Sequence, residues 1–465
     1  MKKYLLFFTI LFLLLNYNYS LSQKHPSELK FESLKFEIPD VSRTELKNGI
    51  ILYLLEDNEL PLINGHALIR TGSIYEPAEK AGLAILTGTV MRTGGTTSRT
   101  GDQIDEELEF IAGSVETSFE KESASATLSV LKNDIDYGLE IFADVLMNPV
   151  FSEDKIDLAK KQTIEQIRRR NDEPGSILDR EFDFLIYGKE SPFARVSTEE
   201  TINFITRDDL INFHKKYFYP NNVIMGFAGD FDSEVLIKKI EKVFEGWEKK
   251  NIDFPVIHEV KSELKGSVNY IFKDINQSNI AIGHLGLKRH NPDLFSVLIM
   301  NQILSFQKLF FKIRTEEGLA YSVGSTFFNP LYVGTFKAVM QTKLESTFNA
   351  VELLKKLVRD IRENLVTDEE LNVAKDTYLN SFVFNFQSSS QILTQEMRLE
   401  YKGYPEDYLK SFRDNIAKIT KEDVQRAAQK YLHPDDFTIL IVGNEKGFDR
   451  PIFEFGEVKT IQLEE

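Results

Sequence analysis

The stretch RDDLINFHKKYFYPNNVIMGFAG at residues 207–229 returns, without a gap, as KEDVQRAAQKYLHPDDFTILIVG at residues 421–443. The two copies share a Tyr-x-x-Pro pattern and a closing glycine at a constant offset. An earlier block, SEDKIDLAK at 152–160, aligns with TDEELNVAK at 367–375 at almost the same offset. Two blocks at nearly one offset indicate an internal duplication, which predicts two copies of one domain of roughly 200 residues.

The repeated blocks also predict local structure. Thr367 and Glu370 have the spacing of a capping box that begins a helix, and Ser152 is expected to cap the matching helix. In the longer block, an amphipathic helix ends near the proline, and a β-rich run closed by glycine follows. Strands are further predicted at 49–55 and 63–70 in the first copy and at 267–273 and 279–288 in the second. A sheet packed with helices, repeated, predicts an α/β fold class of the α+β sandwich kind, with two homologous domains.

The N-terminus has the pattern of a secretory signal. Lys2 and Lys3 precede an apolar run from Tyr4 to Leu15, and a small-x-small site follows at Ser20–Ser22. We expect cleavage near Ser22–Gln23 and a secreted or periplasmic protein, with an uncleaved membrane anchor as the alternative. No later segment is expected to reach transmembrane length, so stable membrane insertion is not predicted.

The repeat and the signal together divide the chain. We predict a signal peptide at 1–22, a first domain at 23–248, a linker at 249–265 and a second domain at 266–465. The linker interpretation depends on the charges and on Pro255 between the two copies.

Composition excludes several classes of function. The 465-residue chain has 56 Lys and Arg against 72 Asp and Glu, a net charge of −16, which argues against nucleic-acid binding. It contains no cysteine, so thiol catalysis and thiolate metal sites are excluded.

Five further stretches occur in a recognisable order. They are LKNGIILYLLEDNELPLINGHALIRTGS (46–73), AGLA (81–84), GTTSR (95–99), DVLMNPVFSEDKI (144–156) and IRTEEGLAYSVGS (313–325). As a set they resemble the insulinase/pitrilysin family, which includes mitochondrial processing peptidase and bacterial two-subunit peptidases. The resemblance covers nearly all of the mature chain and accounts for the duplication.

The resemblance fails at the metal site. Active members carry His-x-x-Glu-His directly after the Gly-Leu-Ala element, because two His at i and i+4 can reach one zinc ion while the Glu activates water. The matching positions here are Ile85, Gly88 and Thr89, and the third family ligand falls at Gln166, with Glu165 beside it. The resemblance therefore implies that this chain binds no zinc, and the zinc is expected in a partner subunit.

No alternative metal site is evident in the sequence. None of the seven histidines stands three or four residues from another. His66 and His284 each follow a glycine on matching predicted strands, and we interpret them as equivalent structural positions in the two copies.

One functional feature of the family is retained. Arg314 and Tyr321 stand where the second domain of the family places an Arg–Tyr pair, which holds the substrate backbone and the developing oxyanion at the zinc site of the opposing half. A guanidinium and a phenol suit that task. The structural alternative is an arginine on a solvated helix face and a tyrosine that opens a strand. The glycine-rich loop of such subunits is replaced here by 304–308, LSFQK.

Three hypotheses follow. The leading one is a non-catalytic subunit of a secreted heteromeric zinc metalloendopeptidase, which pairs with a homologous His-x-x-Glu-His subunit around a peptide substrate. The second is a scaffold or peptide-binding protein of the same fold with no peptidase role. The third, a self-sufficient enzyme, is disfavoured by the missing ligands.

Overall fold

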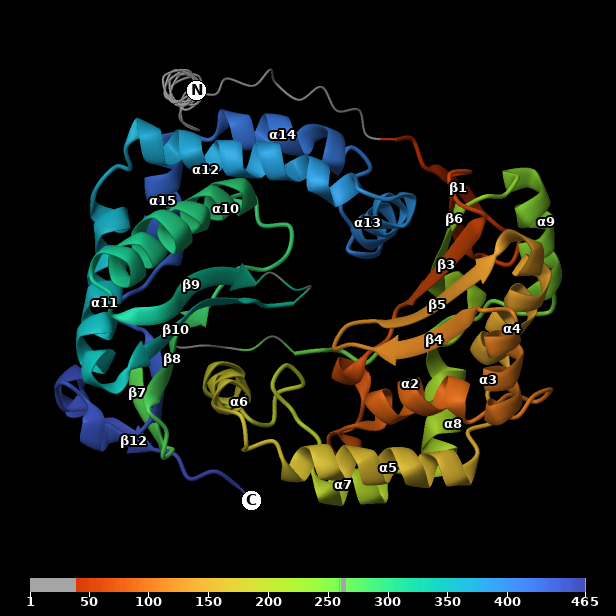
Figure 1. Ribbon diagram of the computed structural model, residues 1–465, viewed down its shortest axis with the longest axis horizontal. Coiled ribbons are helices and arrows are strands. Elements are labelled where there is room, and N and C mark those ends of the chain that lie inside the picture. Colours follow the sequence, from red (N-terminus) through yellow and green to blue (C-terminus); the bar gives the residue numbers. More distant parts are fainter. Residues whose placement is uncertain (1–38, 259, 261–264, 329, 331, 465) are drawn as a thin grey trace, which may run out of the picture. The chain divides into compact units, whose positions relative to one another are not determined.

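The computed structural model describes residues 39–258, 260, 265–328, 330 and 332–464. The predicted signal peptide, its cleavage site and residues 23–38 lie outside the described residues. From Pro39 onward the chain forms one compact unit that contains two six-stranded sheets, each packed with helices (Figure 1). The predicted fold class is therefore confirmed.

The first sheet has the strand order β1-β2-β6-β3-β5-β4. Its strands are β1 (Ser42–Glu45), β2 (Ile51–Glu56), β3 (Leu62–Ile69), β4 (Ser114–Phe119), β5 (Ala124–Leu131) and β6 (Val223–Gly229). The helices of this half are α2 (Leu83–Thr93), α3 (Gly101–Phe110), α4 (Ile135–Met147), α5 (Glu153–Arg168), α6 (Pro174–Tyr187), α7 (Glu199–Phe204), α8 (Arg207–Tyr217) and α9 (Ser233–Val243).

The second sheet has the strand order β12-β7-β11-β8-β10-β9. Its strands are β7 (Ser267–Phe272), β8 (Gln277–Leu285), β9 (Ala320–Phe328), β10 (Thr335–Lys343), β11 (Thr438–Gly443) and β12 (Val458–Thr460). Its helices are α10 (Leu294–Gln302), the π-helical η6 (Ile303–Glu316), α11 (Thr347–Glu363), α12 (Asp368–Ser381), α13 (Ser389–Tyr401), α14 (Tyr408–Lys418) and α15 (Lys421–Tyr431).

The duplication is visible in the strand pairing. In each sheet the strand after the repeated helix, β6 or β11, runs parallel to the first long strand and antiparallel to the next. The outer edges differ, because β1 pairs antiparallel with β2 whereas β12 pairs parallel with β7. One edge strand thus comes from the start of the described chain and the other from its end.

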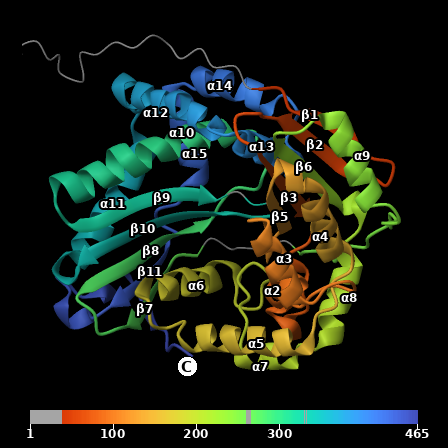
Figure 2. The same ribbon diagram turned by 45° about the vertical axis from the view of Figure 1, so that its right-hand side comes forward.

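Each sheet has two covered faces. On one face of the first sheet, α2, α4, α8 and α9 contribute to the larger core, and α10, α11, α12 and α15 do the same on the second sheet (Figure 2). The opposite face is covered by a helix from the other half of the sequence. α13 packs Leu393 and Met397 on β2, β3 and β6, and α6 packs Ile177 and Phe182 on β7, β8 and β11. Figure 1 shows both helices beside the opposite sheet.

Ion pairs hold these exchanged helices in place. Arg43 on β1 binds the Glu400 carboxylate of α13 through Nε and Nη2 at 2.8 and 2.7 Å, and the Tyr53 hydroxyl donates to the same carboxylate. On the other side, Lys337 of β10 pairs with Asp179 of α6. Since α6 and α13 occupy equivalent places in the repeat, this exchange is itself duplicated.

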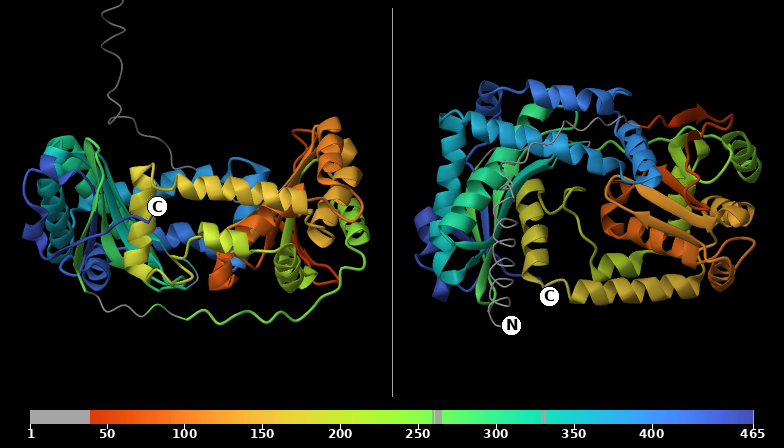
Figure 3. Two further views of the ribbon diagram at one scale, coloured as in Figure 1. Left: turned by 90° about the horizontal axis from the view of Figure 1, so that it is seen from below. Right: turned by 45° about the horizontal axis from the view of Figure 1, so that its top comes forward.

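The structure tests the predicted repeat helices, their caps and the segment between the two halves. The helices of the long repeat are α8 and α15, and Thr367 forms the expected capping box with Glu370. Ser152 stands at the N-cap of α5 as expected, but its side chain makes no capping hydrogen bond. Residues 248–258 contain neither helix nor strand and run from the first half toward the second (Figure 3).

The expectation that no later segment reaches transmembrane length also needs correction. Among the described residues, the continuous helix Leu294–Glu316 has 23 residues, and an 18-residue stretch within it has a mean hydropathy of 1.4, enough to cross a membrane by length and composition. Half of that stretch is buried inside the fold, where Val297, Met300 and Ile303 belong to the second core. A core helix passes the same test.

The two strand histidines are not equivalent positions. His66 pairs with Gly226 on β6, whereas His284 lies beyond the last β11 partner of β8, Gly283. His66 faces the same side of β3 as Leu68, which packs with α13, while the His284 ring stacks on Phe437 at 5.6 Å. Both histidines follow a glycine in the sequence, but they lie at different positions in the pairing of β3 with β6 and of β8 with β11.

Candidate functional site

The helix that carries the zinc ligands in active relatives is present as α2. Ile85 and Thr89 lie one turn apart on its exposed face, and Ile85 is 49% exposed. The Thr89 hydroxyl donates a hydrogen bond to the Ile85 carbonyl at 3.0 Å. The geometry of an i, i+4 pair is therefore retained, but an alkyl group and an engaged hydroxyl are not zinc ligands.

At Gly88, the position of the water-activating glutamate in active relatives, the Phe119 side chain of β4 occupies the space that a side chain would need. Gly88 is buried, and a Cβ atom there would lie 2.7 Å from Cδ2 of Phe119 and 3.2 Å from its backbone nitrogen. The Thr117 hydroxyl donates to the Gly88 carbonyl at 2.7 Å, which draws β4 against the helix. A glutamate at this position would collide with Phe119 unless the strand moved.

The third position lies on α5, which packs against α2. Gln166 is exposed there, and the neighbouring Glu165 is 65% exposed and pairs with Arg168 at 2.8 Å. Throughout the part of the chain that the structure describes, no group of three or more His, Cys, Asp or Glu side chains could hold a metal ion. The residues present at these four positions do not fit zinc.

A buried acid that sequence reasoning missed supports α2. Gly82 adopts φ 102° at the N-cap, and the Glu76 carboxylate accepts hydrogen bonds from the backbone nitrogens of Gly82 and Ala84 at 3.0 and 2.9 Å. Burial raises the pKa of Glu76 to about 7, against the lowering effect of these bonds and of Arg195. Glu76 lies six residues before the N-cap, beyond a short 3-10 helix at Ala78–Lys80, so no local spacing rule pointed to it.

Arg314 lies near the end of η6. Its side chain is exposed, and its Cζ lies 4.8 Å from the ring centroid of Phe310. Within the described residues it makes no hydrogen bond or ion pair, so its guanidinium donors are available. The guanidinium itself lies over the ring in a cation–π contact, which uses none of its N–H donors in a hydrogen bond.

Tyr321 lies on β9, an edge strand that pairs only with β10 in the sheet. Ser322 pairs with Gln341 and Ala320 pairs with Thr342, so Tyr321 is the extra residue of a β-bulge. It is 49% exposed, and its hydroxyl has no hydrogen-bond partner among the described residues. Bulges re-aim side chains and are frequent beside functional sites.

The segment that replaces the glycine-rich loop is helical. Residues 304–308 belong to η6, and Lys308 pairs with Glu370 at 2.7 Å and with Asp360 at 3.6 Å. Gln307 donates to the Glu370 carbonyl at 2.9 Å. The segment before Arg314 is therefore anchored to α11 and α12.

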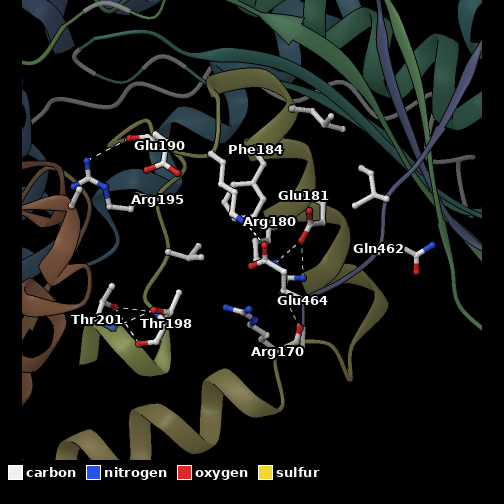
Figure 4. A pocket seen from close by; sticks show the side chains of 15 residues that line it. Arg170, Arg180, Glu181, Phe184, Glu190, Arg195, Thr198, Thr201, Gln462 and Glu464 are labelled. Atoms are coloured by element: carbon white, nitrogen blue, oxygen red, sulfur yellow. Dashed lines mark hydrogen bonds and ion pairs between the residues drawn. The ribbon is translucent and has the colours of Figure 1, made fainter. Parts of the chain in front are cut away.

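A separate pocket of about 400 Å³ lies among α6, the end of α5, the loop at 189–201 and the segment 461–464 (Figure 4). Its lining is rich in charge, and it could not be predicted from the sequence because its parts are far apart in the chain. The charged lining residues are Arg170, Arg180, Glu181, Lys189, Glu190, Arg195 and Glu464.

Comparisons with known proteins agree with this geometry. Residues 66–184 match the family described as "Insulinase (Peptidase family M16)", and residues 205–378 match "Peptidase M16 inactive domain". A Bacillus subtilis protein named "Uncharacterized zinc protease YmxG" is 24% identical over 413 residues, covering 86% of this chain and 98% of that protein.

Two further relatives bear on the lost ligands. The "Non-peptidase homolog YmxG" of Helicobacter pylori is 25% identical over 423 residues, covering 87% of this chain and 95% of that protein. The crystal structure of a peptidase M16 inactive domain from Pseudomonas fluorescens superimposes with a TM-score of 0.79 at 24% identity, covering 87% of this chain and 98% of that chain. The structural likeness shows a shared fold.

Proposed function

Because the chain belongs to the insulinase family, peptidase family M16, as a member of its inactive type, we propose that it is the non-catalytic subunit of a heteromeric zinc metalloendopeptidase. Its partner would be a homologous subunit with an intact His-x-x-Glu-His motif, and its substrate a peptide. The observation that carries the proposal is a contrast within one chain. The zinc-ligand residues are absent and the space beside Gly88 is occupied by Phe119. In contrast, Arg314 and Tyr321 are present and exposed, and their side chains make no hydrogen bond within the described residues.

The chemistry of the pair fits a role in trans. When a peptide carbonyl is attacked, negative charge develops on its oxygen, and donors aimed at that oxygen stabilise the transition state. The guanidinium of Arg314 offers forked donors, and the bulged Tyr321 offers a hydroxyl from an edge strand. A chain without its own metal ligands has no internal use for such donors.

The surroundings of the pair support an interface. Three further aromatic side chains on η6 and β9 are between 47% and 59% exposed, and they belong to Phe306, Phe311 and Phe328. The two elements pack against each other. Exposed aromatic groups beside a polar functional pair are typical of surfaces that meet a partner.

We further propose that the protein is exported through the N-terminal signal and acts in the periplasm or outside the cell. The apolar run and small-residue site at the N-terminus support this location.

The test is reconstitution from separate subunits. Each subunit is purified alone, and cleavage of a peptide pool is measured for each and for their mixture. We expect no cleavage by this chain alone and a rate that rises and saturates as it is added to the zinc-bearing subunit. If the zinc-bearing subunit is fully active alone and does not bind this chain, the scaffold role replaces the proposal.

A further inference from the structure

The pocket in Figure 4 has a feature that the proposed function does not use. Four basic side chains line it, and two of them are paired with acidic side chains of the same lining. Arg180 donates to the Glu181 carboxylate, to the Arg170 carbonyl and to the Asn171 side chain at 2.9, 3.2 and 2.8 Å. Lys189 pairs with Glu464.

The other two basic side chains have unused donors. Arg170 makes no side-chain hydrogen bond or ion pair within the described residues, and its Nε is buried. Arg195 donates through Nη1 to the Glu76 carbonyl at 2.9 Å and through Nη2 to the Glu190 carbonyl at 3.5 Å, and its buried Nε has no partner. The terminal nitrogens of Arg170 are not among the buried atoms and keep their donors, and arginine donors match carboxylate oxygens best.

An acidic residue of the chain already lines the edge of this pocket, where the Glu464 side chain is 64% exposed. Ile461 continues from β12 by donating its backbone N–H to the Tyr270 carbonyl at 2.8 Å, and Glu464 then reaches Lys189. The Asn171 side chain donates to the Glu464 carbonyl at 2.7 Å. The pKa of Glu464 is lowered, mainly by Lys189 and further by Arg170 and Arg180, so the pocket favours a carboxylate.

We propose that this pocket binds acidic side chains of an extended peptide, with Arg170 and Arg195 as the groups that receive the carboxylates. The segment 461–464 forms one wall and already presents one acidic side chain in this manner. A space of about 400 Å³ beside it accommodates further side chains. All the lining residues belong to this chain, so the pocket can be tested without the proposed peptidase partner.

The experiment uses the purified chain and isothermal titration calorimetry at low ionic strength, where charge pairing is least screened. The probe is an acetylated, amidated tetraglutamate peptide, and tetraglutamine is the uncharged comparison. We expect saturable binding of tetraglutamate only, weakened by added salt. Arg170→Gln should weaken binding at least tenfold.

Arg169→Gln is the matched control. Arg169 is the neighbouring residue, but it is 79% exposed, pairs with Asp172 and does not line the pocket. It should leave tetraglutamate binding unchanged. Thermal unfolding checks that both variants fold like the parent, and Arg170→Lys, which keeps the charge, should retain part of the affinity.

Free glutarate is titrated as a second arm. Binding of glutarate that depends on Arg170 as strongly would support the carboxylate site and assign it to free dicarboxylates. The proposal is overturned if tetraglutamate does not bind the parent chain, or if Arg169→Gln weakens binding as much as Arg170→Gln does.

Discussion

Replacing Gly88 by alanine tests whether the catalytic-base position is physically closed. The added Cβ would lie 2.7 Å from the Phe119 ring, closer than packed atoms tolerate, so Phe119 or the helix must shift. Such overpacking costs about 1–3 kcal/mol. Alanine in place of glycine inside a helix gains about 1 kcal/mol from propensity alone. The expected net effect is a loss of about 1 kcal/mol of unfolding free energy.

The two contributions can be separated with Phe119→Ala. In that background the ring is gone and the nearest remaining contact is the backbone nitrogen of residue 119 at 3.2 Å, so Gly88→Ala should stabilise by up to about 1 kcal/mol, a coupling of up to about 2 kcal/mol between the sites. Gly175→Ala is the matched control, because a Cβ there meets nothing within 4 Å. It should stabilise by about 0.5 kcal/mol.

Urea unfolding followed by tryptophan fluorescence measures these effects. The single tryptophan, Trp247, is buried in the first core against Phe244 and therefore reports this half of the chain. If Gly88→Ala stabilises the parent by as much as it stabilises the Phe119→Ala background, the position is open, and the argument that glutamate cannot fit there is wrong.

Three further predictions concern metal, processing and pH. After dialysis, the isolated protein should hold far less than one zinc per chain by atomic absorption, and about one tightly held zinc would contradict the ligand analysis. Mass spectrometry of the exported native protein should show an N-terminus near Gln23, whereas an intact Met1 in the cytosolic fraction would exclude export. Burial lowers the pKa of His214 from 6.5 to about 4, so its stabilising contribution is present above pH 6.5 and is lost as the pH falls toward 4. On going from pH 7.5 to pH 5, His214→Gln should therefore lose about 2 kcal/mol less unfolding free energy than the parent loses. Equal losses in the variant and the parent would refute this.

The parts of the fold that depend on local pattern were predictable from the sequence. The repeated helix, the proline after it and the following strand recur as α8 with β6 and α15 with β11. These repeated elements follow from periodicity and stop signals, which are properties of neighbouring residues. The family resemblance placed Ile85 and Thr89 on one helical face, and α2 has them there.

The parts that depend on tertiary contact were not predictable. An amphipathic helix does not show which sheet it will cover, so the exchange of α6 and α13 was missed. Phe119 lies 31 residues from Gly88 and closes that position only because β4 packs on α2. Arg170 and Arg195 form a pocket through a loop and a distant segment, and no spacing rule connects them.

The role of Arg314 and Tyr321 is the central claim, and turnover by the reconstituted complex tests it most directly. Steady-state cleavage of a peptide pool is measured for Arg314→Ala and Tyr321→Phe, with Lys312→Ala on the same helix as control and gel filtration to confirm assembly. We predict that each of the first two variants assembles normally but loses on the order of a hundredfold in kcat, with a smaller change in KM, because the lost donors act on the transition state. Cleavage by both variants at the parent rate would contradict the account and leave the pair as ordinary residues of a scaffold.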